Sequence, residues 1–224
     1  MGTVILEMLP VILGAAIVPI WIIIVLFLLR GEKGLPKALA FVTGISAVRV
    51  AQGLVFGYNF NSSQAASSDS GSSAIVSTLL LVIGILLLIT AFKVYRKEDD
   101  PDGPPPKWTQ LFSTATPLKA FLIGAVLVAV AAKQWVFVLS AIATVGAAEL
   151  SQIENILVFL SYVLLTIALP LIPIVLYAVS PQRSAVTLER MGKWLEAHNR
   201  HIVIAVSLIF GVFFLFKGLT GLLG

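Results

Sequence analysis

The amino-acid sequence predicts an all-α membrane protein with six transmembrane helices, on the basis of composition, length and the distribution of charge. Of its 224 residues, 58% are hydrophobic and 12% are charged, and the mean hydropathy is +1.02. The charged fraction is half of the roughly 25% that soluble domains carry, so this composition excludes a water-soluble globule and a disordered chain. A span needs about 20 apolar residues, and a chain of this length holds six spans with short loops.

Six apolar segments are long enough to be these spans. They are apolar nearly all round, as helices surrounded by lipid or by other helices must be. We expect the first segment to be a span and not a cleavable signal peptide, because it lacks a basic start, carries Glu7 and is too long. We expect a single polytopic membrane domain over residues 1–224, with spans at 5–29, 37–58, 74–95, 118–140, 155–179 and 201–222.

The basic residues predict the orientation of the spans. Segments 30–37, 93–119 and 180–200 hold twelve of the fifteen Lys and Arg residues, whereas the N-terminus and segments 59–73 and 141–154 hold none. By the positive-inside rule the three basic segments are cytoplasmic and both termini lie outside. The predicted location is the bacterial inner membrane.

The even number of spans also predicts an internal repeat. With both termini on one side, two halves of three helices have opposite orientation, which is the arrangement of the inverted repeats of secondary transporters. Gly14-Ala15 in the first span has a weak echo in Gly124-Ala125 of the fourth. We therefore expect repeat one over 1–95, a cytoplasmic linker over 96–117 and repeat two over 118–224.

Two basic residues lie deep within the predicted spans. Arg49 is roughly 12 residues into the second span from the cytoplasmic side and Lys133 roughly 15 into the fourth, or about 18 and 22 Å at 1.5 Å per residue. Such a residue costs at least ~2.5 kcal/mol near mid-membrane and usually faces a cavity or a partner. No Asp or Glu lies deep in any span, so an anionic ligand would supply the missing counter-ion. The alternative is that both side chains snorkel to the outer interface.

The predicted substrate site is built around these two cations. Gln52 and Gln134 are their polar neighbours and would help bind a headgroup. Prolines add expected helix breaks, because each removes a backbone donor, and broken helices often line transport sites. The substrate-binding residues are then Arg49, Lys133, Gln52, Gln134 and Pro19, and the helix breaks are Pro19, Pro170 and Pro173.

Segment 183–200 has the pattern of an amphipathic helix on the cytoplasmic face. Its basic residues would lie near anionic lipid headgroups, with Arg190, Lys193 and Trp194 at the interface. The alternative is a plain linker that sets topology. The apolar residues that recur at helical spacing are Leu188, Met191, Trp194, Leu195 and His198.

Enzyme chemistry finds no support in the sequence. There is no cysteine, only two histidines, and no nucleophile–base pair or phosphate-binding loop, so we expect no enzyme activity, cofactor or metal. The pI near 9.5 reflects topology and indicates no nucleic-acid partner. Cation exporters need acidic groups in the membrane, and so do proton relays built from carboxylates. Both functions are therefore disfavoured, because no Asp or Glu lies deep in any predicted span.

Several segments resemble the Gap/Sap family of actinobacterial glycopeptidolipid- and sulfolipid-addressing proteins, within the lysine-exporter superfamily. The segments are LGAAIVPI at 13–20, ALAFVTG at 38–44 and WLEAHN at 194–199. The superfamily usually has Asn-Pro-Lys in span four, where this chain has Ala131-Ala132-Lys133. The lysine is kept, but the helix-breaking proline is not. The resemblance implies export of a polar lipid or glycolipid.

Three functions follow as hypotheses. The first is a transporter that moves a lipid or glycolipid from the inner leaflet outward, with membrane lipid as its partner. The second is an exporter of amino acids or other small solutes. The third is a non-transporting membrane partner of a lipid-export machine. A homodimer and a larger envelope export complex are both compatible with the sequence.

Overall fold

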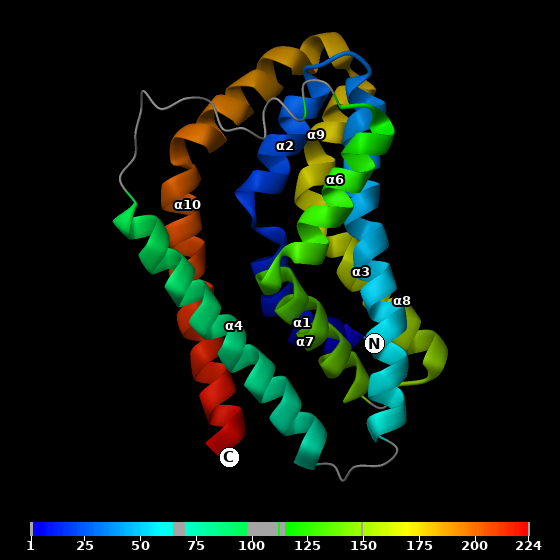
Figure 1. Cartoon of the computed structure of the whole chain (residues 1–224), viewed down its shortest axis with the longest axis vertical. Helices are drawn as coiled ribbons and strands as arrows, with labels where there is room; N and C mark the ends of the chain where they lie inside the picture. The colour runs from blue at the N-terminus through cyan, green and yellow to red at the C-terminus, as the bar shows by residue number, and fades with distance from the viewer. Residues whose placement is uncertain (1, 65–69, 98–111, 113–114, 149, 224) are drawn as a thin grey trace.

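The computed structural model describes residues 2–64, 70–97, 112, 115–148 and 150–223. Over these residues the chain is helical, without a strand. Most of the predicted linker 96–117 lies outside the described residues. Figure 1 shows a bundle in which α4 and α10 run alongside each other on one flank.

The first half of the chain forms four helices. The first predicted span is divided into α1 (Gly2–Ala16) and α2 (Pro19–Leu29), which are bent by 56° relative to each other. The second and third spans are the unbroken helices α3 (Gly34–Gln64) and α4 (Ser70–Arg96). Both unbroken helices extend beyond the predicted spans into the serine-rich segment between them.

The second half contains two further bent pairs. Helices α6 (Pro117–Val130) and α7 (Ala132–Gly146) meet at 76°, and α8 (Gln152–Thr166) and α9 (Ala168–Val179) meet at 63°. The last helix, α10 (Pro181–Leu223), is continuous. It curves across one end of the molecule before it descends beside α4 (Figure 1).

The helices are long and apolar enough for a multi-pass membrane protein, as the sequence predicts. Within the described residues, α3, α4 and α10 are each able to cross a membrane alone, and the count rises to six if each bent pair is one span. The architecture is therefore an all-helical membrane fold. The count of six, the inverted repeat and the orientation of the termini stay predictions.

Local sequence explains where several helices begin. Helix α6 starts with Pro117 after the N-cap Thr116, whose side-chain oxygen accepts a hydrogen bond from the Lys119 backbone N–H at 3.3 Å. Helix α8 starts with a capping box, in which Ser151 and Glu154 bond each other's backbone N–H groups. Both caps lie at ends of the bundle, where water or lipid headgroups would otherwise have to accept the hydrogen bonds of these backbone N–H groups.

Prolines account for two of the three breaks. Pro19 is the first residue of α2, a position where the missing N–H costs nothing. In a continuous helix the N–H of residue 170 would donate to the carbonyl of Thr166, but Pro170 has none, and α8 ends at Thr166. Pro173 differs from the expectation, because α9 runs through it. The chain already bends before Pro170. Pro173 therefore removes only one backbone hydrogen bond, which an N–H at this position would donate to the Leu169 carbonyl.

The break between α6 and α7 forms without a proline. Ala131 leaves the helical conformation with φ −81° and ψ 97°. The indole N–H of Trp135 donates to the Ala129 carbonyl at 2.6 Å, which satisfies an acceptor that the break leaves open. A tryptophan side chain thus stabilises an interruption that no proline marks.

Glycines allow two helix pairs to approach closely. A Cβ at Gly44 of α3 would collide with the Phe121 carbonyl oxygen of α6, and one at Gly124 of α6 with the Phe41 carbonyl oxygen of α3. Such small residues at crossings are typical of membrane helix packing. The α4–α10 pair is similar, with close approaches at Gly84, Gly211 and Gly218.

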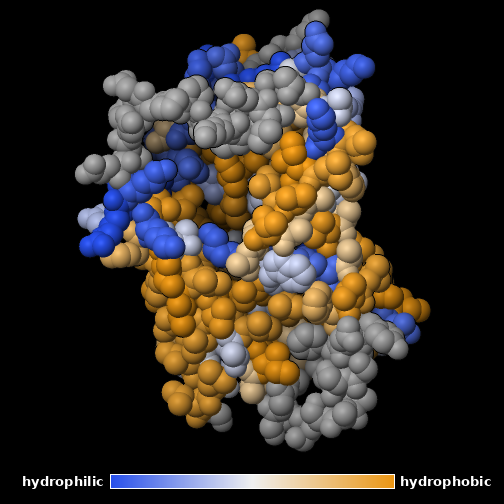
Figure 2. Space-filling view, viewed as in Figure 1, coloured by the Kyte–Doolittle hydropathy of each residue, from blue (hydrophilic) through white to orange (hydrophobic). Residues whose placement is uncertain are grey.

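The surface separates polar from apolar residues along the long axis. Figure 2 shows hydrophilic residues gathered at the end that holds the α2–α3 turn and the start of α10 and over the nearby end of α4, and a mainly apolar surface over the remaining length of α4 and α10. We call this the basic end, and the opposite end, toward which the chain termini lie, the terminal end (Figure 1). On the face in view, the surface is hollowed between α10 and α2 (Figure 2).

Candidate functional site

Arg49 is the most unusual residue of the bundle interior. It lies on α3 with none of its surface exposed, and it is the largest fully buried side chain among the described residues. Its guanidinium donates from Nη1 to the Thr166 hydroxyl at 2.7 Å and from Nη2 to the Gln134 side-chain oxygen at 2.9 Å. The sequence predicts Arg49 and Gln134 as site residues, but it does not predict that they contact each other.

The two partners of Arg49 come from helix breaks. Thr166 is the last residue of α8, and Gln134 is the third residue of α7, just after the interruption at Ala131. The Thr166 hydroxyl donates its own proton to the Val163 carbonyl at 2.8 Å, so its oxygen is free to accept from Arg49. The guanidinium therefore joins an intact helix to two broken ones.

No carboxylate balances the charge of Arg49 within the described part of the chain. Both hydrogen-bond partners are neutral, and the one ion pair found there, between Lys193 and Glu189, lies at the basic end. A buried charge without a counter-ion costs several kcal/mol, even when hydrogen bonds satisfy part of it. This arrangement suits a binding site in which a bound anion supplies the counter-ion of Arg49.

Unpaired polar atoms surround the same region. Arg49 Nε, both amide atoms of Gln52 and the Tyr162 hydroxyl are buried and lack a hydrogen-bond partner. Gln52 lies one turn from Arg49 on α3, and Tyr162 lies one turn before Thr166 on α8, close enough to Arg49 for an electrostatic interaction. Buried polar groups are normally paired, so a cluster of orphans next to a cation indicates space for a polar ligand or water.

Lys133 has a different environment from Arg49. It is half-buried on α7 and makes no hydrogen bond or ion pair with another described residue. Consecutive helical residues are rotated by about 100°, so Lys133 and Gln134 project in different directions. The structure joins Gln134 to Arg49 and shows no such contact for Lys133. Convergence of both cations on one headgroup stays a prediction.

Two members of the polar cluster were missed in the sequence. Tyr162 and Thr166 lie four residues apart, and Pro170 follows four residues later. This spacing places them on one helix face that ends at a break. It is the only local signal for them, since their proximity to Arg49 depends on tertiary packing. Pro19 is buried at the start of α2, and the hydrogen bonds of Arg49 go to Thr166 and Gln134 and not to this residue.

The start of α10 packs partly against protein. Leu188 and Leu195 are buried in the core that includes Leu26 and Leu29 of α2. Trp194, predicted on the same apolar face, is instead 55% exposed, and its ring stacks on His198 with centroids 4.8 Å apart. The predicted stripe is therefore divided, because the side that meets α2 belongs to the protein core.

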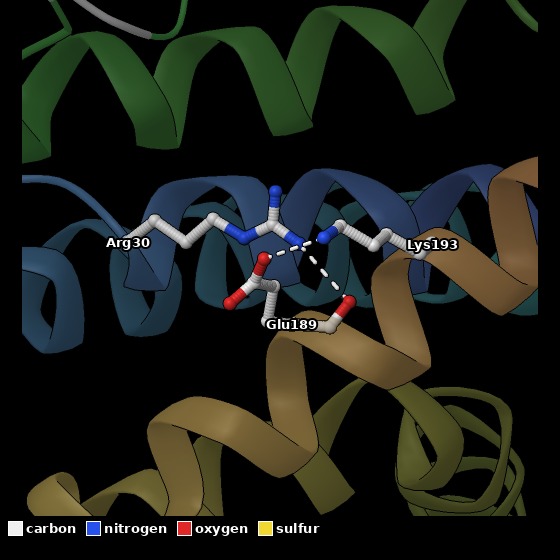
Figure 3. A network of polar contacts seen from close by, with 3 residues as sticks. All are labelled: Arg30, Glu189 and Lys193. Carbon is white, nitrogen blue, oxygen red and sulfur yellow. Dashed lines mark hydrogen bonds and ion pairs between the residues drawn. The ribbon is translucent and has the colours of Figure 1, made fainter.

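A polar network fixes this segment to α2 (Figure 3). Arg30 Nη2 donates to the Glu189 backbone carbonyl at 3.4 Å, and Lys193 Nζ lies 2.8 Å from Glu189 Oε1. Lys193 and Arg190 are exposed, as an interfacial role requires. The interfacial role of Arg190, Lys193 and Trp194 stays a prediction.

Comparison with known proteins identifies a family. The family model described as Sap, sulfolipid-1-addressing protein, matches residues 8–220. The match covers nearly the whole chain and confirms the resemblance to the Gap/Sap family, whereas the lysine-exporter superfamily stays a prediction. Comparisons with curated proteins and with solved structures find no match.

Proposed function

The chain belongs to the family described as Sap, sulfolipid-1-addressing protein, and on that premise we propose that it is a transporter that exports a polar lipid or glycolipid. Family and helical architecture together support a membrane protein linked to lipid export. The observation that carries the transporter role is the fully buried Arg49, which has only neutral partners among the described residues. We propose that Arg49 binds the acidic or polyhydroxy headgroup of this lipid.

The free edge of the guanidinium is where the headgroup would bind. Arg49 has five N–H donors, and its Nε donor is without a partner. The Tyr162 hydroxyl and the Gln52 amide supply further unpaired donors. An acidic headgroup that accepts from these groups replaces three orphaned contacts with charge-assisted hydrogen bonds, which are about twice as strong as neutral ones.

An apolar cavity next to this cluster suits a lipid tail. It measures about 300 Å³ and is lined by α3, α7 and α8. Val50 and Gly53 of its wall directly follow Arg49 and Gln52 in the chain. Phe159 also lines it, with its ring centroid 5.7 Å from that of Tyr162. A polar site beside an apolar cavity fits an amphiphile better than a hydrophilic solute.

An exporter of amino acids or other small solutes is the second candidate. The complete burial of Arg49 favours it, since a small anion is easier to enclose than a lipid headgroup. The apolar cavity beside the cluster favours the lipid. A non-transporting partner of an export machine would need neither the buried cation nor the cavity.

Transport requires that the buried cluster opens. Arg49, Gln52, Gln134, Tyr162 and Thr166 are all buried in this structure, so it corresponds to an occluded state. The breaks at 17–18, 131 and 167 are the natural hinges, because two of them hold partners of Arg49. Lys133, beside the break at 131, would guide the anion toward the site.

We further propose that the basic end faces the cytoplasm and that both termini lie outside, which gives transport its direction. Cysteines at Ser151, at the terminal end, and Thr187, at the basic end, test this, because both positions are exposed and the chain has no other cysteine. An impermeant thiol reagent added to cells should label the first and spare the second. Labelling of position 187 alone would reverse the direction of transport.

Lipid exchange in proteoliposomes tests the function itself. The purified protein is placed in phosphatidylcholine vesicles that contain phosphatidylglycerol with a fluorescent acyl chain, and dithionite bleaches the fluorophore in the outer leaflet. Wild-type protein should expose inner-leaflet probe, and Arg49→Gln should not. Arg30→Gln is the matched control, because Arg30 is an exposed cation at the basic end. Equal exchange by Arg49→Gln and wild type would remove Arg49 from the mechanism, and no exchange by wild type would contradict the function.

A further inference from the structure

A second cavity lies toward the terminal end, outside the cluster around Arg49. It measures about 690 Å³ and is bounded by α1, α4, α7 and α10. Two charged residues of opposite sign line it, Glu7 from α1 and Lys217 from α10. The polar residues that complete its wall are Ser77, Thr144 and Thr220.

The charged groups of this cavity are free to bind a ligand. Neither Glu7 nor Lys217 makes an ion pair with another described residue, although both face the same space. The Thr144 hydroxyl donates to the Ser140 carbonyl at 2.9 Å, and the Thr220 hydroxyl to the Phe216 carbonyl at 3.0 Å. Their oxygens remain acceptors. The cavity thus offers one cation for an acidic group, and a carboxylate with hydroxyl oxygens for hydrogen-bond donors.

One face of α7 connects the break beside Arg49 with this cavity. Residues spaced by three or four along a helix share a face. The residues on this face, from the break outward, are Lys133, Phe137, Ser140 and Thr144, and Thr144 lines the cavity. The Ser140 hydroxyl is buried without a hydrogen-bond partner, as are the polar atoms near Arg49.

An aromatic pair between α7 and α10 borders the cavity. Phe137 of α7 meets Phe214 of α10 edge to face, with centroids 6.1 Å apart. Phe214 is fully buried and lines the cavity, while Phe137 lies one turn beyond Gln134, the partner of Arg49. Gly14 of α1 makes room for this pair, since a Cβ there would lie 2.9 Å from the Phe137 ring.

We propose that this cavity is a second headgroup site, for amphiphiles whose headgroup combines an acidic group with hydroxyl or ammonium donors. Lys217 binds the acidic group, and Glu7 with the Thr220 hydroxyl accepts from the donors. This proposal rests on the proposed function, because it places the same substrate at the terminal end after it has left Arg49. Phe137 and Phe214 separate the two sites.

Protection of a cysteine tests the proposal by binding alone. Thr144→Cys is introduced into the cysteine-free chain, and its reaction rate with a cationic methanethiosulfonate is measured in phosphatidylcholine nanodiscs. The probes are phosphatidylglycerol, which has a phosphate and two hydroxyls, and phosphatidylmethanol, which has the phosphate alone. Phosphatidylglycerol should slow the reaction severalfold, and phosphatidylmethanol should need about a tenfold higher content for the same effect. Ser151→Cys, outside this cavity, is the control and should not respond.

Two substitutions assign the roles of the charges. Lys217→Gln should shift protection by both probes about tenfold, and Glu7→Gln should remove the difference between them. Both residues are exposed, so neither change threatens folding. An unchanged reaction rate at position 144 with phosphatidylglycerol, or protection that survives both substitutions, would overturn the proposal.

The result is separable from the test of the proposed function. Arg49→Gln should stop lipid exchange and leave protection at position 144 intact, since the cavity is reached from the terminal end. Protection without exchange by the wild type would contradict the transporter and keep the cavity as a binding site. Exchange without protection would keep the transporter and overturn the second site.

Discussion

Arg49 and Lys133 differ in environment although both interrupt strongly apolar helices. Arg49 is fully enclosed and donates hydrogen bonds to two helices, whereas Lys133 is half-buried and has no described partner. The difference arises from the helix ends around them, since two of the three breaks supply acceptors to Arg49. The environment of a cation in a membrane span therefore depends less on its position along the span than on the helix ends that tertiary packing places beside it.

This comparison separates two of the sequence-based alternatives. A fully buried guanidinium does not snorkel, so the snorkelling interpretation of Arg49 finds no support in the structure. For Lys133 the partial exposure leaves both interpretations open. The substitutions below change each side of the comparison in turn.

Arg49→Met should have the largest effect. Removal of the cation should lower the exchange of phosphatidylglycerol in proteoliposomes by about 100-fold or more. The variant loses both the charged hydrogen bonds to the headgroup and the attraction between Arg49 and the headgroup charge. The melting temperature without lipid should change little, because removal of an uncompensated buried charge offsets the loss of the hydrogen bonds to Thr166 and Gln134. A strongly lowered melting temperature would instead indicate that Arg49 acts only as a structural anchor.

Thr166→Val should have the next largest effect. It removes the acceptor of the 2.7 Å hydrogen bond and leaves the guanidinium less satisfied, which should cost about 1–3 kcal/mol of unfolding free energy. Denaturant unfolding in detergent measures this loss. Thr166→Ser keeps the hydroxyl and is the matched control. Equal stabilities of the two variants would mean that the Arg49–Thr166 bond contributes nothing.

Lys133→Gln should lower lipid exchange by about tenfold or less, because a half-buried cation in higher dielectric interacts more weakly with an anion than Arg49 does. The same proteoliposome assay measures it beside Arg49→Gln. A larger loss for Lys133 than for Arg49 would reverse the ranking of the two cations. Lys133→Arg should restore exchange only in part, since a guanidinium fork differs in shape from an ammonium.

Trp135→Phe should have the smallest effect. It removes the indole N–H that donates to Ala129 and keeps a ring that can pack against Phe56, whose centroid lies 5.5 Å away. The lost hydrogen bond should cost about 1 kcal/mol of unfolding free energy. Thermal unfolding in detergent checks it, with Trp194→Phe as a control at an exposed indole. A neutral result would show that the break at Ala131 is stabilised by packing alone.

The sequence predicts the helices of this fold well and the site only in part. Apolar runs locate the helices, and Pro19 and Pro170 indicate two breaks, because their chemistry is local. The break at Ala131 has no such signal, since it depends on a tryptophan that reaches back to a carbonyl. Arg49 stands out as a buried cation, but its contacts with Gln134 and Thr166 span 85 and 117 residues and arise only on packing.

Calorimetric titration with a short-chain phosphatidylglycerol tests most directly whether Arg49 is the headgroup site. Wild-type and Arg49→Met proteins are compared in a Glu7→Gln, Lys217→Gln background, so that the second cavity does not contribute. The account predicts that Arg49→Met weakens binding by about tenfold or more, the worth of a charge-assisted hydrogen bond to a buried guanidinium. Identical affinities in the two proteins would contradict it.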